Sequence, residues 1–76
     1  MHTASQAAVL SGAISRLQNL VTVKRETIAS MLALIKMGGQ SETDTKVTQI
    51  LIETKAVEIT HLETTITELR NLREGT

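Results

Sequence analysis

The sequence contains no cysteine and no Phe, Trp or Tyr. Without Cys the chain can form neither a disulfide nor a Cys/His cluster for structural zinc, and 76 residues offer little apolar area for a core. Without aromatic residues it lacks the usual anchors of ligand pockets and protein interfaces, and the stacking platforms for single-stranded nucleic acid. The core must therefore be aliphatic, and oligomerisation is the remaining route to a sufficient one.

The formal net charge is zero, and no basic run is longer than Lys24-Arg25. A phosphate-binding surface needs clustered Lys and Arg, so we expect no binding to nucleic acid. The two halves nevertheless differ. Residues 1–37 carry four basic side chains and one acidic one, whereas residues 38–76 carry four basic and seven acidic. Charges of about +3 and −3 favour pairing the first half with the second, within one chain or between chains.

Long apolar segments are also missing. The apolar run from Thr27 to Ile35 is about half the length that crosses a bilayer, so we expect no membrane span. The first residues lack the basic and apolar regions of a cleaved signal peptide. The sequence predicts a soluble chain, and its compartment stays open between the cytoplasm and export without a cleaved signal.

Glycine is scarce, and the pair Gly38-Gly39 is the one place where the helical pattern breaks. Before it, Thr3 and Gln6 form a capping-box pattern that starts a helix. After it, Ser41 and Asp44 form a similar pattern. The sequence therefore predicts residues 1–76 as a single helical hairpin, with a first helix at about 4–37, a turn at 38–41 and a second helix at about 42–73.

Apolar residues in the first helix alternate at spacings of four and three, which is the heptad pattern abcdefg of a coiled coil. Position a is occupied by Ile14, Val21, Ile28 and Ile35. Position d is occupied by Leu10, Leu17, Lys24 and Met31. Leu20 and Leu34 at position g and Leu32 at position e widen this stripe, which favours a bundle of more than two helices.

The second helix is rich in Val, Ile and Thr, but its heptads favour a helix over a strand. Ile52, Ile59 and Ile66 take position a, with Lys55, Leu62 and Leu69 at d. A further apolar stripe, formed by Val47, Ile50 and Val57 and ending at His61, lies at positions c and f. Two apolar faces on one helix indicate a neighbouring chain. The expected protein interface comprises Leu17, Leu20, Val21, Ile28, Met31, Leu32, Ile35, Val47, Ile50, Val57, Ile59, Leu62, Ile66 and Leu69.

Lys24 and Lys55 fall at the same level in the expected core, where a charge needs an acidic partner or a path to solvent. Glu58, one turn beyond Lys55, is such a partner. Polar residues at core positions most often fix the register and the oligomeric state.

One motif could carry metal chemistry. Glu58-Ile59-Thr60-His61 is a Glu-x-x-His on a helix, and Glu26 lies on the preceding helix. This set resembles half of a ferritin-like di-iron site, which implies a four-helix protein formed by dimerisation of two hairpins. The heptad frame, however, places Glu26 at f, Glu58 at g and His61 at c, away from the a/d stripe, so we assign no metal or cofactor.

The sequence thus predicts an all-α, two-helix antiparallel hairpin that oligomerises into a bundle. We expect a non-enzymatic structural or assembly protein that binds itself, as a dimer of hairpins or a larger assembly. Two alternatives stay open: a small adaptor or inhibitor that docks on another protein, and the dimeric ferritin-like protein that uses Glu26, Glu58 and His61.

Overall fold

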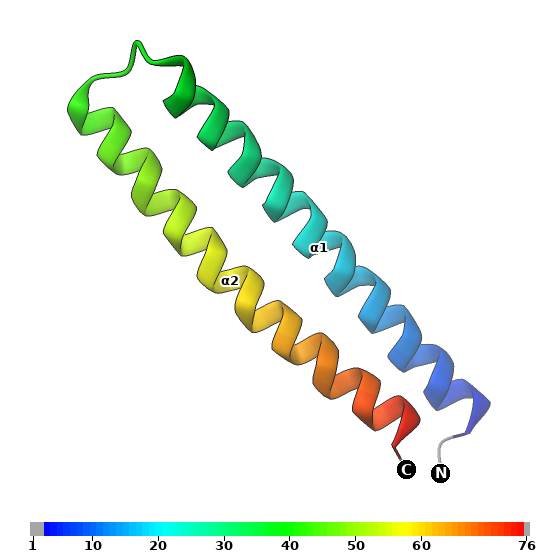
Figure 1. Cartoon of the computed structure of the whole chain (residues 1–76). Coiled ribbons are helices and arrows are strands. Elements are labelled where there is room, and N and C mark those ends of the chain that lie inside the picture. The colour runs from blue at the N-terminus through cyan, green and yellow to red at the C-terminus, as the bar shows by residue number, and fades with distance from the viewer. Residues whose placement is uncertain (1–2, 76) are drawn as a thin grey trace.

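The computed structural model describes residues 3–75, so residues 1, 2 and 76 of the predicted hairpin lie outside the described residues. The described chain forms two α-helices and no strand: α1 (Ala4–Met37) and α2 (Glu42–Glu74). The helices run antiparallel along their whole length, with the turn at one end and both termini at the other (Figure 1). The predicted all-α antiparallel hairpin is therefore confirmed. The molecule is a rod whose Cα extents are 56 × 14 × 12 Å.

The start of each helix follows from its first residues. The Thr3 hydroxyl accepts from the Gln6 backbone N–H at 3.1 Å, while the Thr3 N–H donates to Gln6 Oε1 at 2.9 Å, which completes the expected capping box. At α2, the Ser41 hydroxyl accepts from the Asp44 N–H at 3.1 Å. Glu42 and Asp44 place negative charge at the positive end of the α2 dipole. Both helices therefore start where a side chain satisfies a free backbone donor.

The turn depends on its two glycines, which both have a positive φ. Gly38 has φ 77° and ψ −168°, and Gly39 has φ 84°. The positive φ of Gly38 is typical of a glycine that closes a helix, but its ψ lies far from the left-handed helical region that such a glycine usually adopts. Only glycine adopts this combination readily, so a side chain at position 38 would strain the turn.

Threonine hydroxyls in α2 bond to the backbone of their own helix. In α2 the hydroxyls of six threonines donate to the carbonyl oxygen four residues earlier, at 2.9–3.2 Å: Thr48, Thr54, Thr60, Thr64, Thr65 and Thr67. This internal bond satisfies the hydroxyl without interrupting the helix. Because β-branched residues still lower intrinsic helicity, α2 depends on its packing against α1.

The core is one narrow seam between the helices. Its buried residues are Ile14 and Val21 from α1 and Ile59 and Ile66 from α2. All four occupy position a of the predicted heptads. Partly buried apolar side chains that pack against them come from both helices: Leu17, Ile28, Leu62 and Leu69. A seam with four buried side chains is small for a stable domain.

Candidate protein interface

The residues predicted as a protein interface fall into two groups in the structure. Nine lie in the seam, where α1 and α2 cover them wholly or in part: Leu17, Val21, Ile28, Met31, Ile35, Ile59, Leu62, Ile66 and Leu69. The other five, Leu20, Leu32, Val47, Ile50 and Val57, are 48–61% exposed. The first group holds the hairpin together, and the second is free to contact another molecule.

Six further exposed aliphatic residues were not predicted as interface residues: Val9, Val23, Leu34, Met37, Leu51 and Leu72. Together with the five above they make eleven large apolar side chains on the surface of the described hairpin. Their positions in the heptads are not random. Because two antiparallel helices share their g positions on one side of the seam and their e positions on the other, each hairpin has two lateral faces.

The first lateral face, which contains positions g and c, is here named the aliphatic face. Eight of the eleven exposed apolar side chains belong to it: Val9, Leu20, Val23, Leu34, Met37, Val47, Leu51 and Leu72. A shallow pocket on this side is lined by Leu20, Lys24, Glu58, His61 and Leu62. Lys24, Glu58 and His61 interrupt this face. Scattered surface leucines are ordinary, but eight exposed apolar side chains on one side of two helices are typical of a binding surface.

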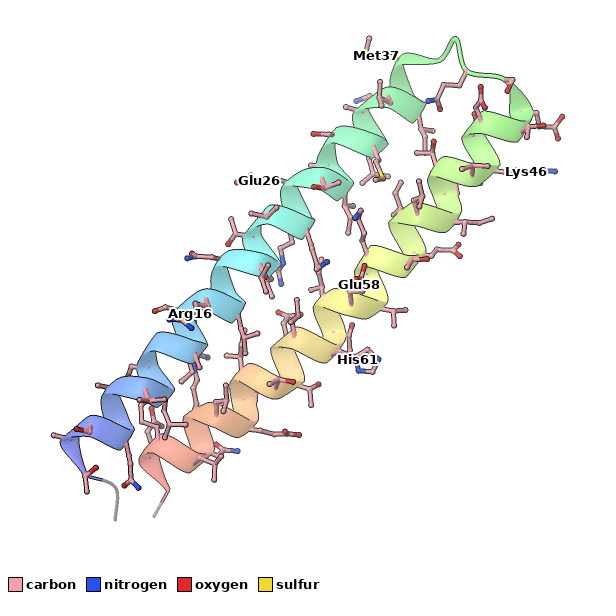
Figure 2. All side chains as sticks on the ribbon, turned by 180° about the vertical axis from the view of Figure 1, so that it is seen from behind. Arg16, Glu26, Met37, Lys46, Glu58 and His61 are labelled. Atoms are coloured by element: carbon pink, nitrogen blue, oxygen red, sulfur yellow. The ribbon has the colours of Figure 1, made fainter. Side chains whose placement is uncertain are left out.

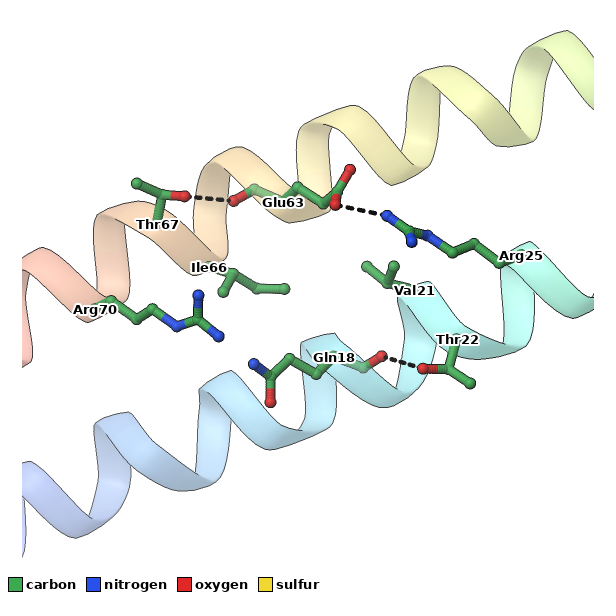
Figure 3. Close-up of a pocket in the computed structure, with 8 residues that line it drawn as sticks. All are labelled: Gln18, Val21, Thr22, Arg25, Glu63, Ile66, Thr67 and Arg70. Atoms are coloured by element: carbon green, nitrogen blue, oxygen red, sulfur yellow. Dashed lines mark hydrogen bonds and ion pairs between the residues drawn. The ribbon is translucent and has the colours of Figure 1, made fainter.

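The opposite lateral face, which contains positions e and b, is here named the polar face. Figure 3 shows a pocket on it in which polar side chains of both helices surround Val21 and Ile66: Gln18, Thr22, Arg25, Glu63, Thr67 and Arg70. Arg25 Nη2 and Glu63 Oε2 form an ion pair at 2.8 Å across this face. Of the exposed apolar residues, Leu32 alone occupies a position of this face, while Ile50 and Val57 lie at position f on the outer side of α2.

One of the two lysines expected at core positions forms an ion pair. Lys24 Nζ donates to Glu58 Oε2 at 3.2 Å, and the two side chains are 24% and 46% exposed. The contact joins α1 to α2 at the edge of the aliphatic face. Lys55, the other lysine at a core position, is partly buried. Lys24 therefore meets the expected requirement for an acidic partner through Glu58.

The three residues considered for metal binding do not come together in the single chain. Glu26 projects from α1 away from α2, whereas Glu58 lies toward α1 and His61 projects from the outer side of α2 (Figure 2). Among residues 3–75, no group of three or more His, Cys, Asp or Glu side chains is placed to hold a metal ion. Glu58 pairs with Lys24 instead. The hairpin alone thus brings two of the three residues near one another and separates the third.

Comparison of the chain with protein-family models, with curated proteins and with solved structures gives no match. Within the described residues, neither helix combines the length and the apolar character needed to cross a membrane. The side chains of the two lateral faces are therefore the main indication of function.

Proposed function

We propose that this protein is a non-enzymatic structural or assembly protein that acts by self-association of its hairpins. The observation that carries the proposal is the unequal distribution of exposed aliphatic side chains, eight of which lie on one lateral face and one on the other. A face with Leu, Val and Met from both helices is the surface that a helical bundle buries.

The exposed area supports the same proposal. A compact monomer of 8.3 kDa is expected to expose about 4,600 Å². The hairpin exposes 5535 Å², an excess of about 900 Å². Each partner in a standard protein interface buries about 800 Å². A rod exposes more surface than a compact monomer of the same mass, and this excess is comparable to the area that one partner buries in a standard interface.

Size-exclusion chromatography with light scattering tests the proposal on the purified chain over a tenfold or wider range of concentration. We expect a mass of at least twice 8.3 kDa that falls toward the monomer on dilution. A mass of 8.3 kDa at every concentration, with fully helical circular dichroism, would contradict self-association. The aliphatic face would then be a binding surface for a different protein, as in the adaptor alternative.

A further inference from the structure

We propose that two hairpins pair through their aliphatic faces with both turns at the same end, so that α1 of each copy lies on α2 of the other. This inference rests on the proposed self-association and adds the partner, the face and the orientation. Two arrangements with twofold symmetry bring the faces together. The twofold axis runs either along the helices, with the turns together, or across them, with the turns at opposite ends.

Net helix charge separates the two arrangements. Residues 4–37 of α1 carry about +3 and residues 42–74 of α2 about −3. With the turns together, each basic helix lies on the acidic helix of the partner, and every neighbouring pair is antiparallel. With the turns at opposite ends, α1 lies on α1 and α2 on α2, which places like charges together. Neighbouring helices are antiparallel in both arrangements, so net helix charge, and not the helix dipoles, favours one of them.

Two charged residues at the edges of the aliphatic face also favour the arrangement with the turns together. Arg16 and Glu68 both occupy position c, at the outer edges of this face, and both are exposed. Neither takes part in a side-chain hydrogen bond or an ion pair with any residue between 3 and 75. Within one chain they lie on opposite edges of the face. A second hairpin with its turn at the same end brings the Glu68 edge of one copy over the Arg16 edge of the other.

Arg16 of one copy and Glu68 of the other also lie at the same height along the rod. In an antiparallel hairpin, two residues at the same level along the rod have numbers whose sum is nearly constant. Side-chain hydrogen bonds join residues 24 and 58, 11 and 73, and 25 and 63, whose numbers add to 82, 84 and 88. The numbers of Arg16 and Glu68 add to 84. A twofold axis along the helices keeps each residue at its level, so Arg16 of one copy lies level with Glu68 of the other. The symmetry forms this contact twice per dimer.

The same register places apolar side chains opposite one another. Leu34 of one copy lies level with Leu51 of the other, near the turns. Val9 lies close to the level of Leu72, near the termini. A dimer in this arrangement is a four-helix bundle that has two ion pairs at the edges of its new interface and aliphatic contacts between them.

Charge reversal tests the orientation, with the dimer dissociation constant measured by sedimentation equilibrium. We expect Arg16→Glu and Glu68→Arg each to weaken the dimer about tenfold, because each change places like charges together at two symmetric contacts. The double variant should return to within about threefold of the wild-type chain. If the dissociation constant of the double variant rises by the product of the two single-variant increases, the proposed orientation is overturned. Reversal of the Arg25 and Glu63 pair on the polar face is the matched control, and it should leave the dimer constant unchanged.

Distances between spin labels test the orientation without changing the charged contacts. The chain has no cysteine, so Thr43→Cys places one label per chain near the turn, on the outer side of α2. With the turns together, the two labels should lie about 20–35 Å apart across the bundle. With the turns at opposite ends they would lie about 45 Å apart or more, because 15 residues separate position 43 from the middle of α2. Val57→Cys, near the middle, should give a short distance in both arrangements.

The outcomes separate this inference from the proposed function. A dimer with long distances for position 43 and short ones for position 57 would overturn the orientation and leave self-association intact. A chain that stays monomeric by sedimentation would contradict both.

Discussion

The two lateral faces of the hairpin are built on the same backbone and the same seam, yet they carry different side chains. On the polar face, Arg25 and Glu63 bridge the helices, and Gln18 and Arg70 complete a hydrated surface. On the aliphatic face, the equivalent flanking positions hold leucine at residues 20, 34, 51 and 72. The polar face needs no partner, because water satisfies its charges. The aliphatic face stays exposed to water unless another molecule covers it.

This difference shows how a two-helix chain can carry exposed apolar residues on one lateral face and charged residues on the other. A hairpin with a symmetrical apolar surface could bind partners on both sides and would tend to polymerise. In the proposed dimer, charges on one face direct association to the other, which favours a closed dimer of hairpins. In the proposed dimer, Arg25 and Glu63 would serve specificity more than stability, since both are more than half exposed and an exposed ion pair contributes little.

The largest effect is expected from breaking the seam beneath both faces. Ile59 is 8% exposed, so Ile59→Ala should lower the free energy of unfolding by about 3 kcal/mol through lost burial and the cavity left behind. We expect a marked loss of helical circular dichroism or a strongly lowered denaturation midpoint. Ile50→Ala is the matched control on the same helix, because Ile50 is 61% exposed. Equal destabilisation by both variants would contradict the placement of the seam.

A smaller but more specific effect is expected from a matched pair of leucines on α1. Leu34 on the aliphatic face is 49% exposed and Leu32 on the polar face is 52% exposed. Leu34→Glu should weaken the dimer by about 100-fold or more, because it places two carboxylates in an apolar interface. Leu32→Glu should change the dimer constant by no more than about threefold. Sedimentation equilibrium measures both, and a reversed order of effects would assign association to the other face.

The smallest effect is expected on the polar face itself. Arg25→Ala removes the 2.8 Å contact to Glu63, and we expect a loss of no more than about 0.5 kcal/mol in unfolding free energy. Salt should reduce the difference between the variant and the wild-type chain, because exposed charges are screened. Urea denaturation at low and high ionic strength provides the measurement. A loss of several kcal/mol, or a change in oligomeric mass, would show that this face does more than repel association.

Much of the fold could be predicted from the sequence because periodicity and capping are local signals. The 3.5-residue spacing placed Ile14, Val21, Ile59 and Ile66 together, and these are the four residues that the structure buries. Thr3 and Ser41 marked the starts of the helices, and each helix begins at the expected residue. The end of α2 at Glu74 lies one residue beyond the expected end.

The division of the surface into two faces was harder to predict. It depends on which flanking positions of α1 and α2 share a side, and this follows only once the helices are antiparallel and in register. Leu51 and Leu72 were missed because they do not belong to the stripe of Val47, Ile50 and Val57 that stands out in α2 alone. Their common position g with Leu20 and Leu34 was the signal that could have found them. The extended ψ of Gly38 carried no sequence signal, since glycine permits many conformations.

The most direct test of the account is an isotope-filtered nuclear Overhauser experiment on an equal mixture of ¹³C-labelled and unlabelled chains, which detects only contacts between copies. We predict contacts between copies at the methyl groups of Leu20, Leu34, Val47 and Leu51, and none at Leu32. Contacts at Leu32 with none at the four other residues would contradict the central claim that the aliphatic face joins two hairpins.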